Sequence, residues 1–290
     1  MASKPRAKPK PKVKAKPKPP LAIDLKAIFG LEPEKAVEYM KAKGYAITWN
    51  WQEMLDQAHD QAFTVAKAMR LDLLSDIRGA LETALQDGQT LAQFTKALQP
   101  VLETQGWWGK QVIVDSSGGA EMVQLGSPRR LKTIYQTNLQ SAYMAGRKAE
   151  MEETVETHPY WMYVAILDGK TRPSHRALHG KVFRHDDPIW SSIFPPNGFN
   201  CRCRVVALTE AAVKRRGLAV VSSKGLVTTR TVETGADKRT GEIRTAQVTS
   251  LRTTDSEGRV AVFSTDPGFN HAPGAGLAEA LKLKQAAANQ

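Results

Sequence analysis

The spacing of apolar residues changes once along this 290-residue chain, near residue 158, and that change sets the class of fold. Before this point, apolar side chains recur at three- and four-residue steps, which is the period of an amphipathic helix. After it, short β-branched and aromatic segments alternate with turn sequences such as Thr240-Gly241, a pattern typical of antiparallel strands. The sequence therefore predicts an α+β fold with an N-terminal helical part, a compact mixed motif and an antiparallel β-hairpin extension.

Four helices are predicted before residue 158. Their apolar stripes cover residues 33–44, 55–87, 90–101 and 128–157. Thr90 suits an N-cap and Pro128 suits a first helical turn. The segment 106–126, which contains Ser-Ser-Gly-Gly, predicts a loop or hairpin. Strands are predicted at residues 160–167, 205–208, 225–233, 242–253 and 259–265.

These patterns divide the chain into five parts. They are a Lys/Pro-rich arm (1–20), a helical N-terminal region (21–126), a motif-bearing core (127–208), a β-rich extension (209–275) and a C-terminal tail helix (276–290). No run of eighteen or more apolar residues occurs, and the N-terminus lacks the apolar region of a secretory signal. We therefore expect neither a transmembrane segment nor a membrane partner.

The N-terminal arm carries most of the excess positive charge. The formal net charge is +12, and residues 1–20 contain eight Lys or Arg and no acid. A sequence of Lys, Pro and Ala can bury almost no apolar surface, so we expect disorder. The arm could neutralise DNA phosphates, lie in an acidic groove of a protein, or act as a solubilising tail, and charge alone does not separate these roles. The basic residues concerned are Lys4, Arg6, Lys8, Lys10, Lys12, Lys14, Lys16 and Lys18.

Polar residues are densest in the segment 168–204. Pro173 suits the first turn of a short helix, on which His175 and His179 would share one face because they are four residues apart. The two cysteines follow a proline-rich turn and are separated by one residue, so a disulfide between them would be strained. Zinc accepts nitrogen and sulfur ligands in a tetrahedral arrangement, which makes a zinc site chemically reasonable. The candidate ligands are His175, His179, Cys201 and Cys203, with Asp168 as the alternative ligand.

The same residues also fit a role without metal. Zinc knuckles and ribbons usually present two Cys-x-x-Cys pairs, and Cys-x-Cys on an extended strand would point its thiols to opposite faces. In this alternative, Cys201 and Cys203 are small buried residues, His179 is hydrogen-bonded at a helix end, and Asp168 caps a turn. Both alternatives stay open from sequence alone.

The segment also resembles a known family. LDGKTRPSHRALHGKVF at residues 167–183, DDP at 186–188 and PPNGFNCRCR at 195–204 together resemble the phage Mu F-type head morphogenesis family. The likeness extends to residues 128–147 and 266–274. The structural motif comprises Asp168, Thr171, Arg172, Pro173, Gly180, Asp187, Pro195, Pro196, Asn200 and Arg202.

The resemblance implies a minor capsid protein of a tailed bacteriophage or prophage, rather than an enzyme. Such a protein assembles in the host bacterial cytoplasm and stays in the virion head. The implied partners are portal, major capsid or scaffold proteins at the portal or procapsid interior, together with packaged double-stranded DNA. In the portal-associated branch, the position of His175 is commonly Cys and a His precedes Cys-Arg-Cys. Gly198 or Phe199 stands there in this chain, which leaves the fourth ligand open between His179 and Asp168.

Two other functions remain as alternatives. The first is a zinc-dependent hydrolase, a nuclease or protease acting during head maturation, with Asp168 or Asp187 as general base. Such an enzyme needs an open coordination position, which four protein ligands would not leave. The second is a DNA-condensing or DNA-escorting protein in which the basic arm is the main functional element.

Overall fold

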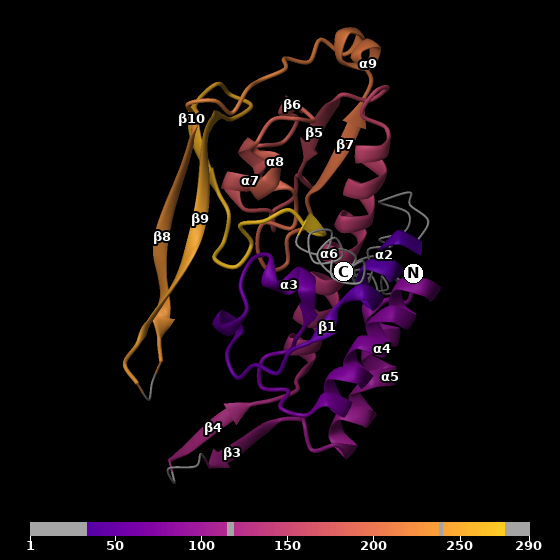
Figure 1. Cartoon of the computed structure of the whole chain (residues 1–290), viewed down its shortest axis with the longest axis vertical. Coiled ribbons are helices and arrows are strands. Elements are labelled where there is room, and N and C mark those ends of the chain that lie inside the picture. The colour runs from indigo at the N-terminus through magenta and orange to yellow at the C-terminus, as the bar shows by residue number, and fades with distance from the viewer. Residues whose placement is uncertain (1–33, 115–118, 238–239, 276–290) are drawn as a thin grey trace, which may run out of the picture.

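The computed structural model describes residues 34–114, 119–237 and 240–275 (Figure 1). The predicted arm at 1–20 and the predicted tail helix at 276–290 lie outside the described residues. One long helix runs through the middle of the molecule, with shorter helices packed against it and a small sheet beside its second half. A second sheet extends along one side, and a separate hairpin projects from the helical end. The α+β class predicted from sequence is confirmed.

The helical part consists of four helices, three of which pack on the fourth. They are α2 (Glu34–Ala42), α4 (Leu71–Asp87), α5 (Leu91–Thr104) and the central α6 (Pro128–Glu153). Thr90 caps α5 by accepting a hydrogen bond from the Gln93 amide, and Ser127 caps α6 in the same way. Gly88 ends α4 in the left-handed conformation, with φ 64°, which glycine adopts without strain.

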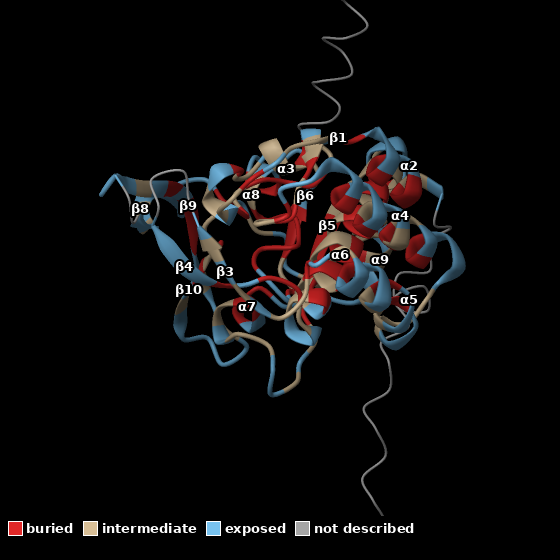
Figure 2. Ribbon diagram, turned by 90° about the horizontal axis from the view of Figure 1, so that it is seen from below, coloured by how far each residue is buried: buried red, intermediate tan, exposed pale blue. Residues whose placement is uncertain are grey.

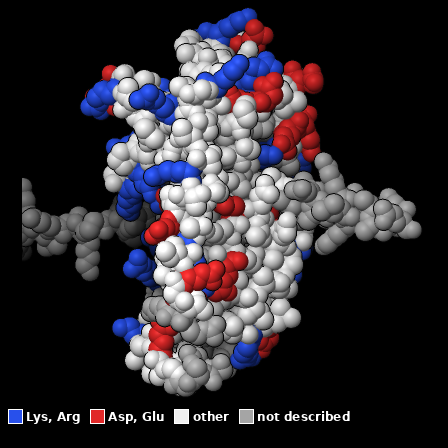
Figure 3. All heavy atoms as spheres, turned by 60° about the vertical axis from the view of Figure 1, so that its left-hand side comes forward, with Lys and Arg blue, Asp and Glu red and all other residues white. Residues whose placement is uncertain are grey.

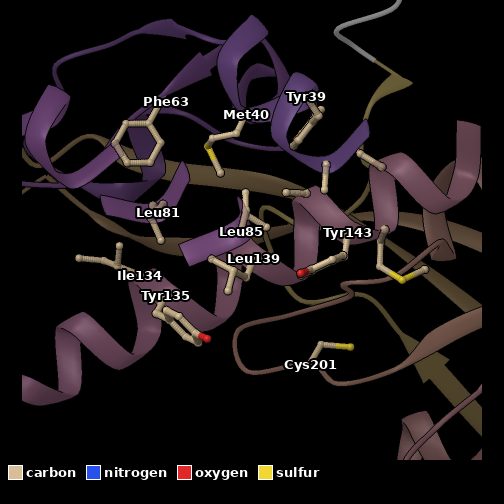
Figure 4. Close-up of a cluster of buried hydrophobic side chains, with 14 of the residues drawn as sticks. Tyr39, Met40, Phe63, Leu81, Leu85, Ile134, Tyr135, Leu139, Tyr143 and Cys201 are labelled. Atoms are coloured by element: carbon tan, nitrogen blue, oxygen red, sulfur yellow. The ribbon is translucent and has the colours of Figure 1, made fainter. Parts of the chain in front are cut away.

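The hydrophobic core lies where these helices face one another. The side chains of Met40, Leu85 and Leu139 come from three different helices and point toward one another (Figure 4). One continuous cluster of buried residues extends from Ala36 to Ala272, so the helical part and the β-rich part share a core. Figure 2 shows buried residues on the inner faces of the helices and along the central strand of the small sheet.

The long helix predicted over residues 55–87 is wrong in its first half. That stretch contains α3 (Ala58–Gln61) and β2 (Ala62–Phe63), which pairs in parallel with β1 (Gly44–Tyr45), and a turn of 3₁₀-helix (Trp51–Glu53) precedes it. Positive φ values of 50° at Asp56 and 67° at Lys67 interrupt any helix. Of the apolar residues with this spacing, Val65 is buried, Met69 is 49% exposed and the others are partly exposed, so their spacing does not mark one buried helix face.

Three separate antiparallel sheets make up the rest of the strands in the described chain. Strand β5 (Tyr160–Val164) lies between β6 (Val182–Arg184) and β7 (Arg204–Leu208). Strand β9 (Ile243–Thr254) lies between β8 (Val227–Ala236) and β10 (Val260–Ser264), which confirms the predicted extension. The predicted hairpin consists of β3 (Lys110–Val114) and β4 (Ala120–Gln124). Short helices α7 (Pro173–Ala177), α8 (Trp190–Ile193) and α9 (Glu210–Arg215) join the strands.

Residues 266–275 return from the β-rich part to the helical part. The amide of Asn270 donates to Asp56 over 2.8 Å, and the amide of Gly274 donates to Asp60 over 3.0 Å. Asp60 is fully buried and also accepts a hydrogen bond from Tyr39. These contacts hold the C-terminal part of the described chain against its N-terminal part. Across the described ranges, none of the helices combines the length and apolarity needed to cross a membrane.

Two neighbouring positions on α4 test this description of the core. Leu81 is completely buried, so Leu81→Ala should lower the free energy of unfolding by about 2–5 kcal/mol. Gly79 lies on the opposite, exposed face with open space around it, so Gly79→Ala should raise that free energy by about 0.5–1 kcal/mol. Denaturant unfolding followed by circular dichroism measures both values. Equal effects at the two positions would contradict the assigned helix face.

Candidate metal centre

One imidazole and two thiols meet in the interior of the molecule. His175 lies on α7, and Cys201 and Cys203 lie in the segment that leads into β7. The three residues are 2%, 7% and 2% exposed. Nδ1 of His175 is 3.7 Å from Sγ of Cys201 and 3.5 Å from Sγ of Cys203. In the described part of the chain, this is the group of His, Cys, Asp and Glu side chains whose ligand atoms converge closely enough to hold a metal ion.

Local backbone structure explains why both thiols reach the same imidazole. Strand β7 begins at Arg204, so Cys201-Arg202-Cys203 lies in irregular chain and not on an extended strand. Asn200 has a φ of 59°, and the Cys201 amide donates to the Gly198 carbonyl over 3.1 Å, which closes a tight turn. The alternation that would separate the thiols on a strand therefore does not apply.

Arg202, between the two cysteines, points to a different partner. Its guanidinium donates two hydrogen bonds to the carboxylate of Asp168, over 2.8 and 2.6 Å, and a third over 3.2 Å to the hydroxyl of Thr171. Asp168 also accepts from the Lys170 amide, so it caps its own turn. The hydrogen bonds from Arg202 hold the pKa of Asp168 well below its ordinary value. Asp168 is thus committed to Arg202 and does not join the thiol cluster.

His179, the other proposed ligand, also lies outside the cluster. Helix α7 ends at Ala177, so His175 and His179 do not share a helical face, contrary to the prediction. The His179 ring places Nδ1 3.0 Å from the backbone oxygen of Ala165 and 3.2 Å from its nitrogen. The structure therefore brings together three of the four predicted ligands. His179 is hydrogen-bonded just beyond a helix end, as in the alternative without metal.

The surroundings of the cluster include residues that sequence reasoning missed. Tyr163 on β5 is completely buried and donates a hydrogen bond to Asn197 over 2.9 Å. Burial, together with the neighbouring cysteines, raises the pKa of Tyr163 well above its ordinary value. The Phe263 ring on β10 packs 5.3 Å from the His175 ring, and Gln140 on α6 donates to the Cys203 carbonyl over 2.6 Å. Asn197 and Gln140 lie within segments that carry the family resemblance, whereas Tyr163 and Phe263 lie outside them and had no local signal.

The two thiols have opposite electrostatic environments. Hydrogen bonds from Cys203 and His175 outweigh burial and lower the pKa of Cys201 well below its ordinary value. The pKa of Cys203 is raised, because its hydrogen bond with Cys201 and burial both disfavour a second negative charge. The cluster therefore stabilises one thiolate, which is the form of cysteine that binds metals.

The remaining motif residues have structural positions around the cluster. Arg172 forms an ion pair with Asp266 over 2.8 Å, and Pro173 occupies the first turn of α7. Gly180 adopts a φ of 79°, and the bond between Pro195 and Pro196 is cis. Asp187 accepts hydrogen bonds from the amides of Ser223 and Ile189 over 3.0 and 3.1 Å. Both carboxylates proposed as a general base, Asp168 and Asp187, are thus engaged by other groups.

The pairing of Asp168 with Arg202 gives a pH-dependent prediction. Asp168→Asn removes the charge, and it should lower the melting temperature at neutral pH because Arg202 loses its ionic partner. In the unfolded chain the pKa of Asp168 has its ordinary value of 3.8, and in the folded protein it is lower, so the ionised carboxylate stabilises the fold at pH values above 3.8. This stabilisation disappears as the pH falls from 3.8 through the folded-state pKa. The difference in melting temperature between wild type and Asp168→Asn should therefore be constant above about pH 5 and shrink below pH 3.8.

Asp186→Asn is the matched control for this experiment. Asp186 pairs with Arg184 two residues away, and both side chains are more than half exposed, so its loss should change the melting temperature little at any pH. Calorimetric or circular dichroism melts between pH 2 and pH 8 supply the comparison. Identical melting temperatures for wild type and Asp168→Asn at neutral pH would contradict the role given to this pair.

Comparison with known proteins agrees with the motif. Residues 75–206, from α4 to β7, match the family described as Phage Mu protein F like protein. The chain is 50% identical over 257 residues to the Putative capsid assembly protein F of Escherichia phage Mu, a match that covers 88% of this chain and 57% of that protein. It is also 47% identical over 230 residues to the Mu-like prophage FluMu F protein of Haemophilus influenzae, covering 76% and 55%.

The chain thus spans about half the length of the curated relatives it matches. No solved structure matches it significantly. The resemblance stated from residues 128–204 is confirmed, and the matched region contains all three residues of the buried cluster. The chain belongs to the family of phage Mu protein F like proteins.

Proposed function

We propose that this chain is a minor capsid protein that takes part in assembly of the head of a tailed phage. The observation that carries the proposal is the 50% identity over 257 residues to a protein named as a capsid assembly protein. That identity extends beyond the family segment 75–206 and so includes flanking parts of the chain. In this role the protein assembles in the host cytoplasm, at the portal or procapsid interior, and contacts portal, major capsid or scaffold subunits.

The geometry around the cluster supports an assembly role better than a hydrolytic one. The pairs formed by Arg202 with Asp168 and by Arg172 with Asp266 tie together segments that are 34 and 94 residues apart. Such links fix the relative positions of segments that are distant in the sequence. A hydrolase would also need a free general base near the cluster, and the two proposed carboxylates are occupied by other partners.

We assign contact with DNA to the basic arm and not to the folded part. Outside residues 1–20, the net charge is small relative to the total of +12. On the face drawn in Figure 3, basic and acidic side chains are interspersed and do not form one continuous basic surface. Eight Lys and Arg within the arm would provide phosphate contacts that do not depend on DNA sequence.

Loss of the protein should block formation of infectious heads. In a phage or prophage whose copy of this gene carries an early stop codon, we expect empty or malformed heads and a large drop in plaque titre. A plasmid copy of the wild-type gene should restore both, and mass spectrometry of purified virions should detect the chain. Heads of normal appearance, DNA content and infectivity without the protein would refute the proposed function.

The arm gives a separate prediction that does not require phage particles. In the wild-type chain, the logarithm of the DNA association constant should fall with the logarithm of salt concentration, with a slope of magnitude up to about 7 for eight phosphate contacts. Deleting residues 1–20 should remove most of that slope. The matched control replaces the eight Lys and Arg with Gln and keeps every proline. An unchanged slope in both variants would exclude the arm as the phosphate contact.

A further inference from the structure

We propose that His175, Cys201 and Cys203 bind one zinc ion, through Nδ1 of the histidine and the two Sγ atoms, and that this ion joins α7 to the segment preceding β7. The proposal goes beyond the assembly function and does not depend on it. It also differs from the ligand set expected from sequence, because it excludes His179 and Asp168.

The distances between the ligand atoms match the edges of a zinc coordination tetrahedron. Bond lengths of about 2.1 Å to nitrogen and 2.3 Å to sulfur, at the tetrahedral angle, place nitrogen and sulfur about 3.6 Å apart. The observed separations from His175 Nδ1 are 3.7 Å to Cys201 and 3.5 Å to Cys203. A single imidazole nitrogen forms one hydrogen bond well, so convergence of two sulfur atoms on it favours a shared metal ion over paired hydrogen bonds.

The chemistry of the ligand atoms selects the metal. Two thiolates and an imidazole are soft or borderline ligands, which suit zinc and do not suit calcium or magnesium, since those ions require oxygen. All three side chains are buried, and both cysteines are free thiols.

Two buried polar atoms near the cluster indicate that a polar species belongs there. Nε2 of His175 and Nδ2 of Asn197 have no hydrogen-bond partner among the described residues, although both atoms are buried. Buried polar atoms are nearly always satisfied, often by ordered water. Zinc at Nδ1 would fix the proton of His175 on Nε2, and this N–H would then donate to such a water. Within the described chain, no fourth His, Cys, Asp or Glu joins the group, so the protein supplies three ligands.

The contacts of the excluded residues support a site of three protein ligands. The His179 ring is bound to the backbone of Ala165, and Asp168 is bound by Arg202. Moving either side chain to the cluster would break those bonds. Arg202 also anchors the turn that carries the two cysteines. It lies between them in the chain and donates hydrogen bonds to Asp168 and Thr171.

The test measures bound metal in the full chain. Protein purified under reducing conditions from zinc-supplemented cells should contain about one zinc ion per chain by elemental mass spectrometry. His175→Ala, Cys201→Ser and Cys203→Ser should each reduce this to less than about a tenth. His179→Gln is the matched control within the same motif, and it should keep the full amount. Circular dichroism of each variant shows whether it has folded.

A second measurement keeps the test decisive if the ligand variants do not fold. Wild-type chain stripped with a chelator and loaded with cobalt(II) should show thiolate-to-cobalt charge-transfer absorption and the intense visible bands of a tetrahedral site. X-ray absorption of the zinc form should fit two sulfur ligands. Wild-type protein without zinc and without the cobalt spectrum would overturn the proposal. Loss of zinc from His179→Gln that remains folded would overturn the three-ligand set.

Discussion

The burial of α6 is the constraint on which the other elements depend. This 26-residue helix carries buried side chains from Leu131 to Met151, so it needs packing partners along most of its length and on more than one face. Helices α2, α4 and α5 contact it, and Gln140 reaches from it to the backbone beside the thiol cluster. Helices α2, α4 and α5 and the β-rich part therefore pack against the same helix. A shift of α6 would therefore change the packing of both parts.

Much of the fold could be predicted from sequence because local signals and packing agree there. Thr90, Ser127 and the strand patterns after residue 204 mark elements that the structure contains. The prediction failed over residues 55–70, where a short helix, a short strand and turns stand in place of one continuous helix and most of the helically spaced apolar side chains are not fully buried. It failed again at His179, because α7 ends before that residue. In both cases tertiary contacts determined the backbone, and spacing along the chain does not report such contacts.

The candidate site was predictable in its residue types but not in its geometry. Local motif density drew attention to His175 and to both cysteines. Whether thiols separated by one residue face the same way depends on a left-handed turn at Asn200, and the roles of Tyr163 and Phe263 depend on strands far away in sequence. The pairing of Asp168 with Arg202 spans 34 residues and removes a carboxylate that sequence alone offered both as a ligand and as a base. Distinguishing these roles required the folded arrangement.

A single turn of α6 meets both ends of the described chain. A side chain at Gly146 would lie 3.2 Å from the backbone of Ala36, and a side chain at Gly274 would lie 3.4 Å from Cβ of the adjacent Ala145. Residues near the beginning and the end of the described chain therefore lie against neighbouring residues of one helix. A shift of this turn of α6 would therefore change the contacts of both segments at once.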